Sequence, residues 1–389
     1  MKTTYLLLCL LGIGSVSGAG QTKQPQKIGD FIESTSYNEH RRNATRSLQY
    51  TPDGDDFVCI NGKNRFTRAL YGSHTAFRLE TSDRPVFAAY TKENPKHICF
   101  KLQTSGGTVA LDSTEHCESR YTAGRRSYSL SDPAFGGGSL SITTWALPDK
   151  EGAIWQFNAR NFKGSNPILL TSISEIRNSK LNRNGDMGAD PADSFEAPLQ
   201  PQQLQSCPAQ IDGTLYILLE NQELRTLTTA EGETLFKKAE AARSETASRI
   251  RIETPDPYFN TLGGTLAMAA DGIWDGEVWL HGAIGWRMPL SGWRAAYTGD
   301  VLGWHDRART HFNAYAASQV TEVPNTLPHP AQDSALHLAR SVKKWGTPQY
   351  SNGYICRNPH RNNQMHHYDM NLCYIDELLW HFKWTGDLD

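Results

Sequence analysis

The segment TAEGETLFKKAEAARSETASRI, residues Thr229–Ile250, marks the point at which the hydrophobic period of the chain changes. Leu235, Ala239 and Ala242 recur within it at roughly helical spacing, with charged residues between them. Thr229 stands at a position that favours a helix N-cap. We therefore predict a connector helix here, with a different architecture on each side of it.

The chain before this helix, residues 49–228, has the pattern of an antiparallel β-sandwich. Short apolar or alternating runs recur over strand lengths, and turn sequences such as Asn61-Gly62 and Asp212-Gly213 separate them. The runs are Phe57–Ile60, His74–Glu80, Arg84–Tyr90, His97–Gln103, Ser139–Leu147, Ala153–Asn161, Ile168–Ile176 and Thr214–Glu220. Many short strands at this spacing are typical of a large sandwich.

The chain after the connector is predicted to consist of helices and two long loops. The predicted helices are Asp256–Asp271, Asp300–Val320, Gln332–Lys344 and Asp369–Lys383, the last of which carries Leu372, Ile375, Leu378, Leu379 and Phe382. The loops Gly272–Gly299 and Trp345–Tyr368 are long for a compact domain, and such loops are usually functional. If consecutive helices form antiparallel hairpins, both loops emerge at the same end of the helices.

The first of these loops, together with Asp300, reads GIWDGEVWLHGAIGWRMPLSGWRAAYTGD (Gly272–Asp300) and combines aromatic with ionisable side chains. They are Trp274, Asp275, Glu277, Trp279, His281, Trp286, Arg287, Trp293 and Arg294. Aromatic rings cover the apolar C–H faces of a sugar, while charged groups bond its hydroxyls and carry protons. The loop therefore predicts a carbohydrate site. The alternative is that the tryptophans pack in the core, since large aromatic residues are usually well buried.

Asp275 and Glu277 are the predicted catalytic residues. Hydrolysis of a glycosidic bond needs two carboxyl groups, about 5–5.5 Å apart for retention or about 6.5–9.5 Å apart for inversion. Tryptophans on both sides of Asp275 and Glu277 could desolvate a carboxyl group and raise its pKa towards that of a working acid. Hydrogen bonding to a sugar is the alternative role for both side chains.

The remaining predicted site residues bind substrate, and they are Trp274, Trp286, Arg287, Trp293, Arg294, Asp300, His366 and Asp369. The two arginines could hold a uronic acid or sugar hydroxyls through bidentate contacts, or form salt bridges within the protein. Asp300 and Asp369 could equally act as helix N-caps. No cofactor is predicted. His366, His367 and Asp369 could form a metal site, but neighbouring histidines on one backbone point in different directions and no third ligand is evident, so no metal is predicted either.

The first residues have the features of a targeting segment. Residues 1–19 combine Lys2, an apolar run and the small residues Ser17–Ala19, which is typical of a secretory signal peptide. Residues 20–48 are polar and irregular, and are predicted to form a mobile arm. The mature chain is therefore expected to be exported, without a membrane-spanning segment.

Net charge and aromatic content limit the classes of ligand that the chain could bind. With 39 basic and 41 acidic residues the chain is nearly neutral, which argues against nucleic acid. The aromatic content of 10% favours a flat-faced ligand such as a carbohydrate.

The cysteines after the signal peptide are Cys59, Cys99, Cys117, Cys207, Cys356 and Cys373. Export permits disulfides among them, but a core of this size does not need them. The oligomeric state is not predicted.

Two phrases, IWDGEVWLHGAIGWRMPLSGWRAAYTGDVLGWHDR (Ile273–Arg307) and YDMNLCYIDELLWHFKWTGD (Tyr368–Asp387), resemble segments of the six-hairpin, (α/α)6-barrel glycoside hydrolases. The resemblance is to an uncharacterised branch of exported bacterial glycan-degradation proteins, and it extends over about Gln49–Asp389. It implies an α+β multidomain fold class. An N-terminal antiparallel β-sandwich (a supersandwich) and the connector at 229–255 precede the first helical hairpins of an (α/α)6 toroid, at 256–389.

The resemblance also implies an activity. It implies a periplasmic or extracellular glycoside hydrolase that acts on a complex polysaccharide bound in the mouth of the toroid. The predicted helices are too few to close a six-hairpin toroid, so we expect the N-terminal portion of a longer protein, with one catalytic carboxylate in a later hairpin. The alternatives are a non-catalytic carbohydrate-binding protein and a polysaccharide lyase, the latter with His366, Tyr368 and Arg287 as candidate residues.

Overall fold

The computed structural model describes residues 50–63, 68–72, 74, 76–90, 96–175, 205–282, 288–289, 296–321, 332–333, 338–339, 353–362 and 368–389. The chain divides into two compact units, Met1–Leu48 and Gln49–Asp389, and every described residue lies in the second. The predicted signal peptide (1–19) and arm (20–48) therefore lie outside the described residues.

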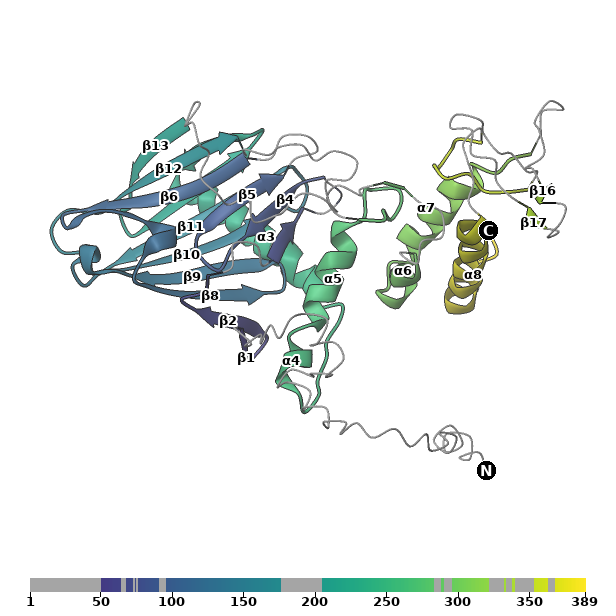
Figure 1. Cartoon of the computed structure of the whole chain (residues 1–389), viewed down its shortest axis with the longest axis horizontal. Helices are drawn as coiled ribbons and strands as arrows, with labels where there is room; N and C mark the ends of the chain where they lie inside the picture. Colours follow the sequence, from purple (N-terminus) through teal and green to yellow (C-terminus); the bar gives the residue numbers. More distant parts are fainter. Residues whose placement is uncertain are drawn as a thin grey trace. The chain divides into compact units, whose positions relative to one another are not determined.

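Two antiparallel sheets form the first part of the described chain (Figure 1). The first sheet has the order β1 (Thr51–Asp53), β2 (Asp56–Ile60), β8 (His116–Thr122), β9 (Arg125–Ser131), β10 (Ser139–Ala146), β11 (Gly152–Arg160), β14 (Thr214–Glu220) and β15 (Glu223–Leu227). The second has the order β13 (Gln205–Gln210), β12 (Ile168–Glu175), β6 (Lys96–Thr104), β5 (Val86–Tyr90), β4 (Arg78–Thr81) and β3 (Arg68–Tyr71), with β7 (Gly107–Ala110) paired to β6.

Aromatic rings from both sheets fill the space between them. Phe87 of β5 lies edge-to-face on Trp155 of β11, with ring centroids 5.5 Å apart. Phe100 of β6 meets Phe157 of β11 in the same way at 5.0 Å. Such a pair adds about 0.5–1.5 kcal/mol beyond the area that it buries. The sheets therefore share one core, and the predicted β-sandwich is confirmed.

The helix α3 (Thr229–Ala247) covers the outer face of the first sheet. Phe236 packs on Trp145 of β10 and on Tyr216 of β14, with ring centroids 4.8 Å and 5.8 Å away. Gly232 makes this approach possible, because a Cβ atom there would lie 2.2 Å from Tyr216 Cγ. The helix predicted at Thr229–Ile250 is therefore present, and it lies on the flank of the sandwich.

The cap of α3 is one residue earlier than predicted. The hydroxyl of Thr228 accepts a hydrogen bond from the Glu231 N–H, and the Glu231 carboxylate accepts one from the Thr228 N–H. This reciprocal capping box satisfies donors that the first turn of a helix leaves free. Thr229 is therefore the first helical residue and not the N-cap.

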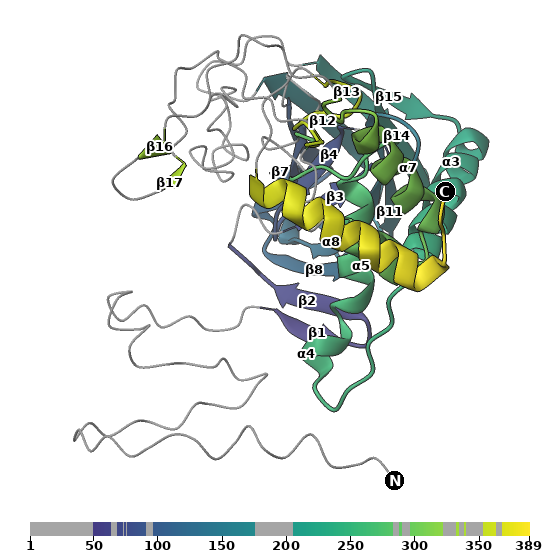
Figure 2. The ribbon, with the colours of Figure 1, turned by 90° about the vertical axis from the view of Figure 1, so that its right-hand side faces the viewer.

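The first two helices predicted after α3 are each broken into two shorter ones. The described helices that follow α3 are α4 (Pro257–Asn260), α5 (Gly263–Gly272), α6 (Tyr297–Val301), α7 (His305–Ala316) and α8 (Tyr368–Thr385). The predicted helix Asp256–Asp271 breaks before Gly263, where a Cβ atom would lie 2.7 Å from the carbonyl oxygen of Ile250. The predicted helix Asp300–Val320 breaks at Gly303, whose φ of 74° is left-handed. Figure 2 shows α8 beside α7, and contacts join the two helices.

At its described positions, the predicted helix Gln332–Lys344 is wrong. The strands β16 (Gln332–Asp333) and β17 (Leu338–Ala339) pair antiparallel there. Helical spacing is a weak signal that other contacts readily override. The predicted helix Asp369–Lys383 is confirmed as α8, and the order of a β-sandwich followed by helices is confirmed with it. None of the described helices is long and apolar enough to cross a membrane.

No disulfide joins the cysteines whose side chains the structure describes. They are Cys59, Cys99, Cys117, Cys356 and Cys373. Burial raises the pKa of Cys117 to about 12, although Arg84 and Arg126 lower it. This thiol is therefore protonated and unreactive at ordinary pH. The side chain of Cys207 lies outside the described residues.

Candidate functional site

The hairpin Trp274–Trp279 carries the two predicted catalytic carboxylates at its tip. Its two end residues pair as an antiparallel bridge, and the Asp275 N–H donates to the Val278 carbonyl at 3.2 Å. Asp275 Oδ1 accepts from the N–H groups of Glu277 at 3.0 Å and of Val278 at 2.8 Å. Gly276 completes the turn with a φ of 101°, which L side chains rarely adopt. The turn therefore holds both carboxylates at an exposed tip.

The indoles of Trp274 and Trp279 turn away from this tip and into the core. They are 3% and 1% exposed, with ring centroids 4.7 Å apart, and they belong to the same hydrophobic cluster as Tyr315 of α7. A covered ring has no free face for a sugar, so the geometry gives Trp274 a core role in place of the predicted substrate contact. These indoles also do not desolvate the carboxyl groups of Asp275 and Glu277 as expected, because both residues are exposed.

His360 pairs with Glu277 at the hairpin tip. Its Nε2 lies 2.6 Å from Glu277 Oε1, and the two side chains are 54% and 49% exposed. The backbone of His360 has a left-handed φ of 59°, and its N–H donates to the carbonyl of Ala314 in α7 at 3.0 Å. Left-handed non-glycine residues are uncommon and cluster at functional sites. The loop 353–362 therefore brings a second ionisable group to the carboxylates.

Tyr315 of α7 lies buried among the same charged groups. Its side chain is fully buried, and burial is the main cause that raises the pKa of its hydroxyl. The charges that act on it are the carboxylates of Asp275, Glu377 and Glu277, which raise the pKa, and the guanidinium of Arg357, which lowers it. Glu377 is itself 2% exposed. A buried polar layer therefore lies close to the exposed carboxylates.

His311 of α7 is held in its neutral form. Its Nδ1 accepts the backbone N–H of Trp279 at 3.2 Å, and burial lowers its pKa to about 3. A neutral imidazole that accepts at Nδ1 carries its proton on Nε2. The bond joins α7 to the hairpin, so His311 helps to fix the position of Glu277.

These groups are suited to proton transfer. Glu277 can exchange a proton with a ligand, and His360 stands at hydrogen-bonding distance to receive or return it. Asp275 supplies a second carboxylate, oriented by two backbone donors, and Arg357 supplies a cation. No group of three or more potential metal ligands occurs among the described residues.

Asp300 joins helices together instead of facing a ligand. It is 6% exposed, its Oδ1 lies 2.8 Å from His305 Nδ1, and both its oxygens lie 2.9 Å from His381 Nδ1 of α8. His381 Nε2 lies 3.4 Å from Asp387 Oδ2, which also pairs with Arg309 Nε at 2.6 Å. The geometry therefore gives Asp300 a structural role in place of the predicted sugar contact.

The other predicted substrate contacts stay predictions. Trp286, Arg287, Trp293, Arg294 and His366 lie outside the described residues. Asp369 is exposed in the first turn of α8, where the helix dipole favours a carboxylate.

The chain is similar to known proteins in two comparisons. A family model described as a domain of unknown function (DUF4450) matches residues 95–250, within the sandwich and α3. No curated protein matches. Among solved structures, the chain is similar to a bacterial glucoamylase complexed with acarbose, at 9% identity and a TM-score of 0.36, over 67% of this chain and 53% of that chain. The chain thus spans about half the length of that protein.

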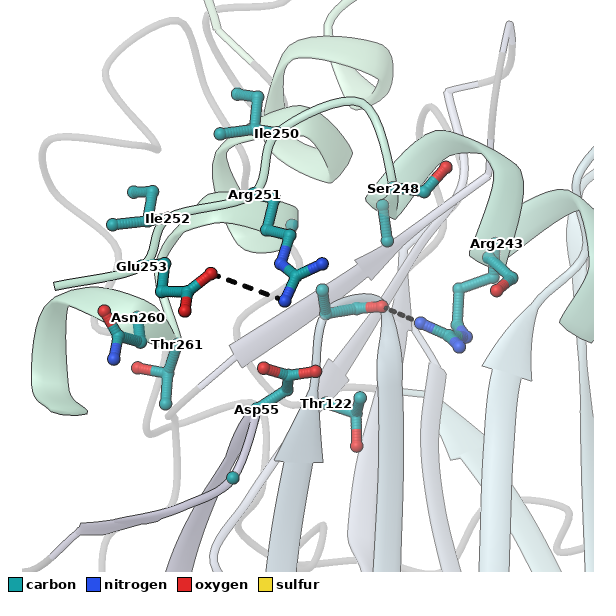
Figure 3. Close-up of a pocket in the computed structure, with 15 residues that line it drawn as sticks. Asp55, Thr122, Arg243, Ser248, Ile250, Arg251, Ile252, Glu253, Asn260 and Thr261 are labelled. Atoms are coloured by element: carbon teal, nitrogen blue, oxygen red, sulfur yellow. Dashed lines mark hydrogen bonds and ion pairs between the residues drawn. The ribbon is translucent and has the colours of Figure 1, made fainter.

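A cavity of about 690 Å³ lies between the end of α3 and the β8–β9 turn, and none of its lining residues belongs to the hairpin (Figure 3). Arg243 closes one side by donating to the Ala123 carbonyl at 2.8 Å, and Arg251 pairs with Glu253 at 3.5 Å on the other. The lining side chains include Asp55 but no aromatic ring. The cavity therefore lacks the stacking surface that a sugar site uses.

Sequence reasoning missed part of the site. His360 pairs with Glu277, and His311 accepts the backbone N–H of Trp279. The charges of Asp275, Glu277, Glu377 and Arg357 act on Tyr315, although these residues come from segments far apart in the chain. The length of the loop Trp345–Tyr368 was a signal for Arg357 and His360. No spacing pointed to the residues of α7 and α8.

Proposed function

We propose that this chain is a secreted glycoside hydrolase, or the N-terminal portion of one, that acts on a complex glycan by carboxylate acid–base chemistry. One observation carries the proposal. The exposed carboxylates of Asp275 and Glu277 share one tight hairpin tip, and His360 of a separate segment pairs with Glu277 at 2.6 Å. The order of a β-sandwich followed by helices supports the proposal.

Glu277 is the proposed acid–base residue. Hydrolysis of a glycosidic bond needs one carboxyl group to protonate the leaving oxygen and another to activate water or attack the sugar. Glu277 is accessible to a ligand, and His360 at 2.6 Å can exchange the proton with it. Asp275 is the proposed second carboxylate, because its backbone donors hold it in one orientation beside Glu277.

The proposed ligand and cellular compartment follow from the proposal of a secreted glycoside hydrolase. The partner is a carbohydrate, held by the site and by Arg287, Arg294, Trp286 and Trp293 of the same loop. The signal-like residues 1–19 support export to the periplasm or the outside of a bacterial cell.

Activity on a panel of polysaccharides tests the proposal. The purified protein and its Glu277→Gln and Asp275→Asn variants are compared by release of reducing sugar, with Glu253→Gln as control. Glu253 is 83% exposed, pairs with Arg251 and does not belong to the hairpin. We expect Glu277→Gln to lower the rate by about 10²–10⁴-fold, the usual contribution of general acid–base catalysis, and the control to keep it.

Other outcomes select other functions. Tight binding of a glycan without turnover would identify a carbohydrate-binding protein. Products that absorb in the ultraviolet would identify a polysaccharide lyase. Equal activity of the wild type and both carboxylate variants would contradict the proposed role of the hairpin tip.

A further inference from the structure

Three buried hydrogen-bond donors lie together near the hairpin tip without an acceptor, and we name them the donor cluster. They are Trp279 Nε1–H, His311 Nε2–H and Tyr315 Oη–H, and none has a partner among the described residues. Ring centroids are 5.7 Å apart for Trp279 and His311, and 4.9 Å for His311 and Tyr315. Native proteins pair nearly all buried polar groups with protein, water or ligand. The donor cluster therefore needs an occupant.

The occupant must accept hydrogen bonds, which excludes a cation. The proton positions are fixed for two of the three groups: an indole nitrogen only donates, and His311 accepts at Nδ1 and so donates at Nε2. Burial keeps His311 neutral and the Tyr315 hydroxyl protonated, so all three remain donors over the ordinary pH range.

An uncharged occupant suits the charges around Tyr315 better than an anion does. The carboxylates of Asp275, Glu277 and Glu377 act on the Tyr315 hydroxyl, and Arg357 is the opposing charge among the described residues that act on it. An anion brought to Tyr315 would meet this excess of negative charge in a poorly solvated place, where repulsion is strong. A hydroxyl oxygen meets no such repulsion.

We propose that the donor cluster binds hydroxyl oxygens of an uncharged sugar, and that it makes the site selective for neutral over acidic saccharides. This inference rests on the proposed function, because it names the substrate class of the same site. One ordered water can extend the reach of a buried donor to a sugar at the exposed rim, since water-mediated hydrogen bonds are nearly as favourable as direct ones.

Binding of matched saccharide pairs to a Tyr315→Phe variant tests the proposal. Isothermal titration measures the affinity of the full chain for trisaccharides of glucose and glucuronate, galactose and galacturonate, and mannose and mannuronate. Tyr374→Phe is the control, because this buried tyrosine lies in the same ring cluster but its hydroxyl already donates to the Phe312 carbonyl at 2.9 Å.

The two variants should separate binding from stability. We expect the wild type to bind the neutral member of at least one pair, and Tyr315→Phe to weaken that affinity by about tenfold, the effect of one lost hydrogen bond. Tyr315→Phe should keep the melting temperature, because it removes an unpaired group. Tyr374→Phe should lower the melting temperature and keep the affinity.

Two results would overturn the inference while leaving the proposed function intact. In the first, the wild type binds the acidic member of each pair as tightly as the neutral member, or more tightly, and cleaves it. In the second, Tyr315→Phe binds the neutral saccharide with the same affinity as the wild type. If the wild type bound no saccharide of either kind, the inference and the proposed function would fall together.

Discussion

Burial of His311 couples the stability of the protein to pH. The ordinary pKa of histidine, 6.5, applies to the unfolded chain, and burial lowers it to about 3 in the folded protein. Between these values the unfolded state binds a proton that the folded state does not. Stability is therefore lost as the pH falls below 6.5, by up to about 1.4 kcal/mol per pH unit.

The variant His311→Asn isolates this dependence. The amide oxygen of asparagine can still accept the Trp279 N–H, but it does not titrate. Urea unfolding at pH 7 and pH 5 should show that the wild type loses about 2 kcal/mol more than the variant between the two conditions. Equal losses in both proteins would show that His311 is not the neutral buried group described here.

Glu80 of β4 produces the opposite dependence. It is 1% exposed, its carboxylate has no hydrogen-bond partner among the described residues, and burial raises its pKa from 4.5 to about 8 against the opposing effect of Arg78. Between these values the folded state holds a proton that the unfolded state has released. Stability is therefore lost as the pH rises from 4.5 to about 8.

The variant Glu80→Gln should remove this loss. The wild type and the variant both keep His311, so the difference between them from pH 6.5 to 8 reports on Glu80. Over this interval we expect the free energy of unfolding to fall by about 1.5 kcal/mol more in the wild type than in the variant. Parallel unfolding curves for both proteins would rule out a buried, protonated Glu80.

At the residue scale, the sequence singled out Asp275 and Glu277 as candidate carboxylates, which stay predictions, but it did not give the direction of the rings beside them. Asp275 and Glu277 were predicted from their place in a long aromatic loop. Trp274 and Trp279 point inward and pair across a tight turn, and that turn depends on Gly276 and on backbone bonds that composition does not reveal. Their orientation could not be inferred from the number of tryptophans.

At the scale of elements, the hydrophobic periodicity of α8 predicts a helix but not which of its faces is buried. Its apolar residues Leu372, Ile375 and Leu379 are 70%, 54% and 52% exposed, while Glu377 and His381 are 2% and 4% exposed. The helix was predicted correctly, because its length and spacing suffice for that. Which face packs on α7 depends on Asp300 and its neighbours, and those contacts are not local.

The N-terminus of α3 gives a test at the same scale. The structure assigns the cap to Thr228, whereas the sequence pattern favoured Thr229, and both side chains are exposed. We expect Thr228→Ala to lower the free energy of unfolding by about 1 kcal/mol, the usual cost of a lost N-cap. Thr229→Ala should change it by less than about 0.5 kcal/mol, as for an ordinary surface position. A larger loss for Thr229→Ala in chemical denaturation would support the sequence-based assignment instead.

At the scale of the whole molecule, the sandwich was predictable and its strand order was not. Alternating runs identified strands such as β11, but not that it pairs with β10 on one side and β14 on the other. Pairing between distant strands depends on the fit of side chains across the core. The break in the first predicted helix could not be foreseen for a similar reason. It lies before Gly263, which packs against the backbone of Ile250 in another segment.

The network around Asp300 links α6, α7 and α8 and gives a test at this scale. Asp300→Asn keeps the shape of the side chain but removes the charge that His305 and His381 contact. We expect a loss of about 1.5–3 kcal/mol in the free energy of unfolding, as for hydrogen bonds to a charged group. Asp306→Asn is the control, since Asp306 is exposed on α7. Equal effects of the two substitutions in urea denaturation would contradict the structural role of Asp300.

A crystal structure of the Glu277→Gln variant, soaked with a neutral oligosaccharide that the wild type cleaves, would show where the sugar binds. We predict a sugar oxygen within hydrogen-bonding distance of residue 277, with Asp275 and His360 beside the same sugar. A sugar bound elsewhere, with no contact to the hairpin Trp274–Trp279, would contradict the account.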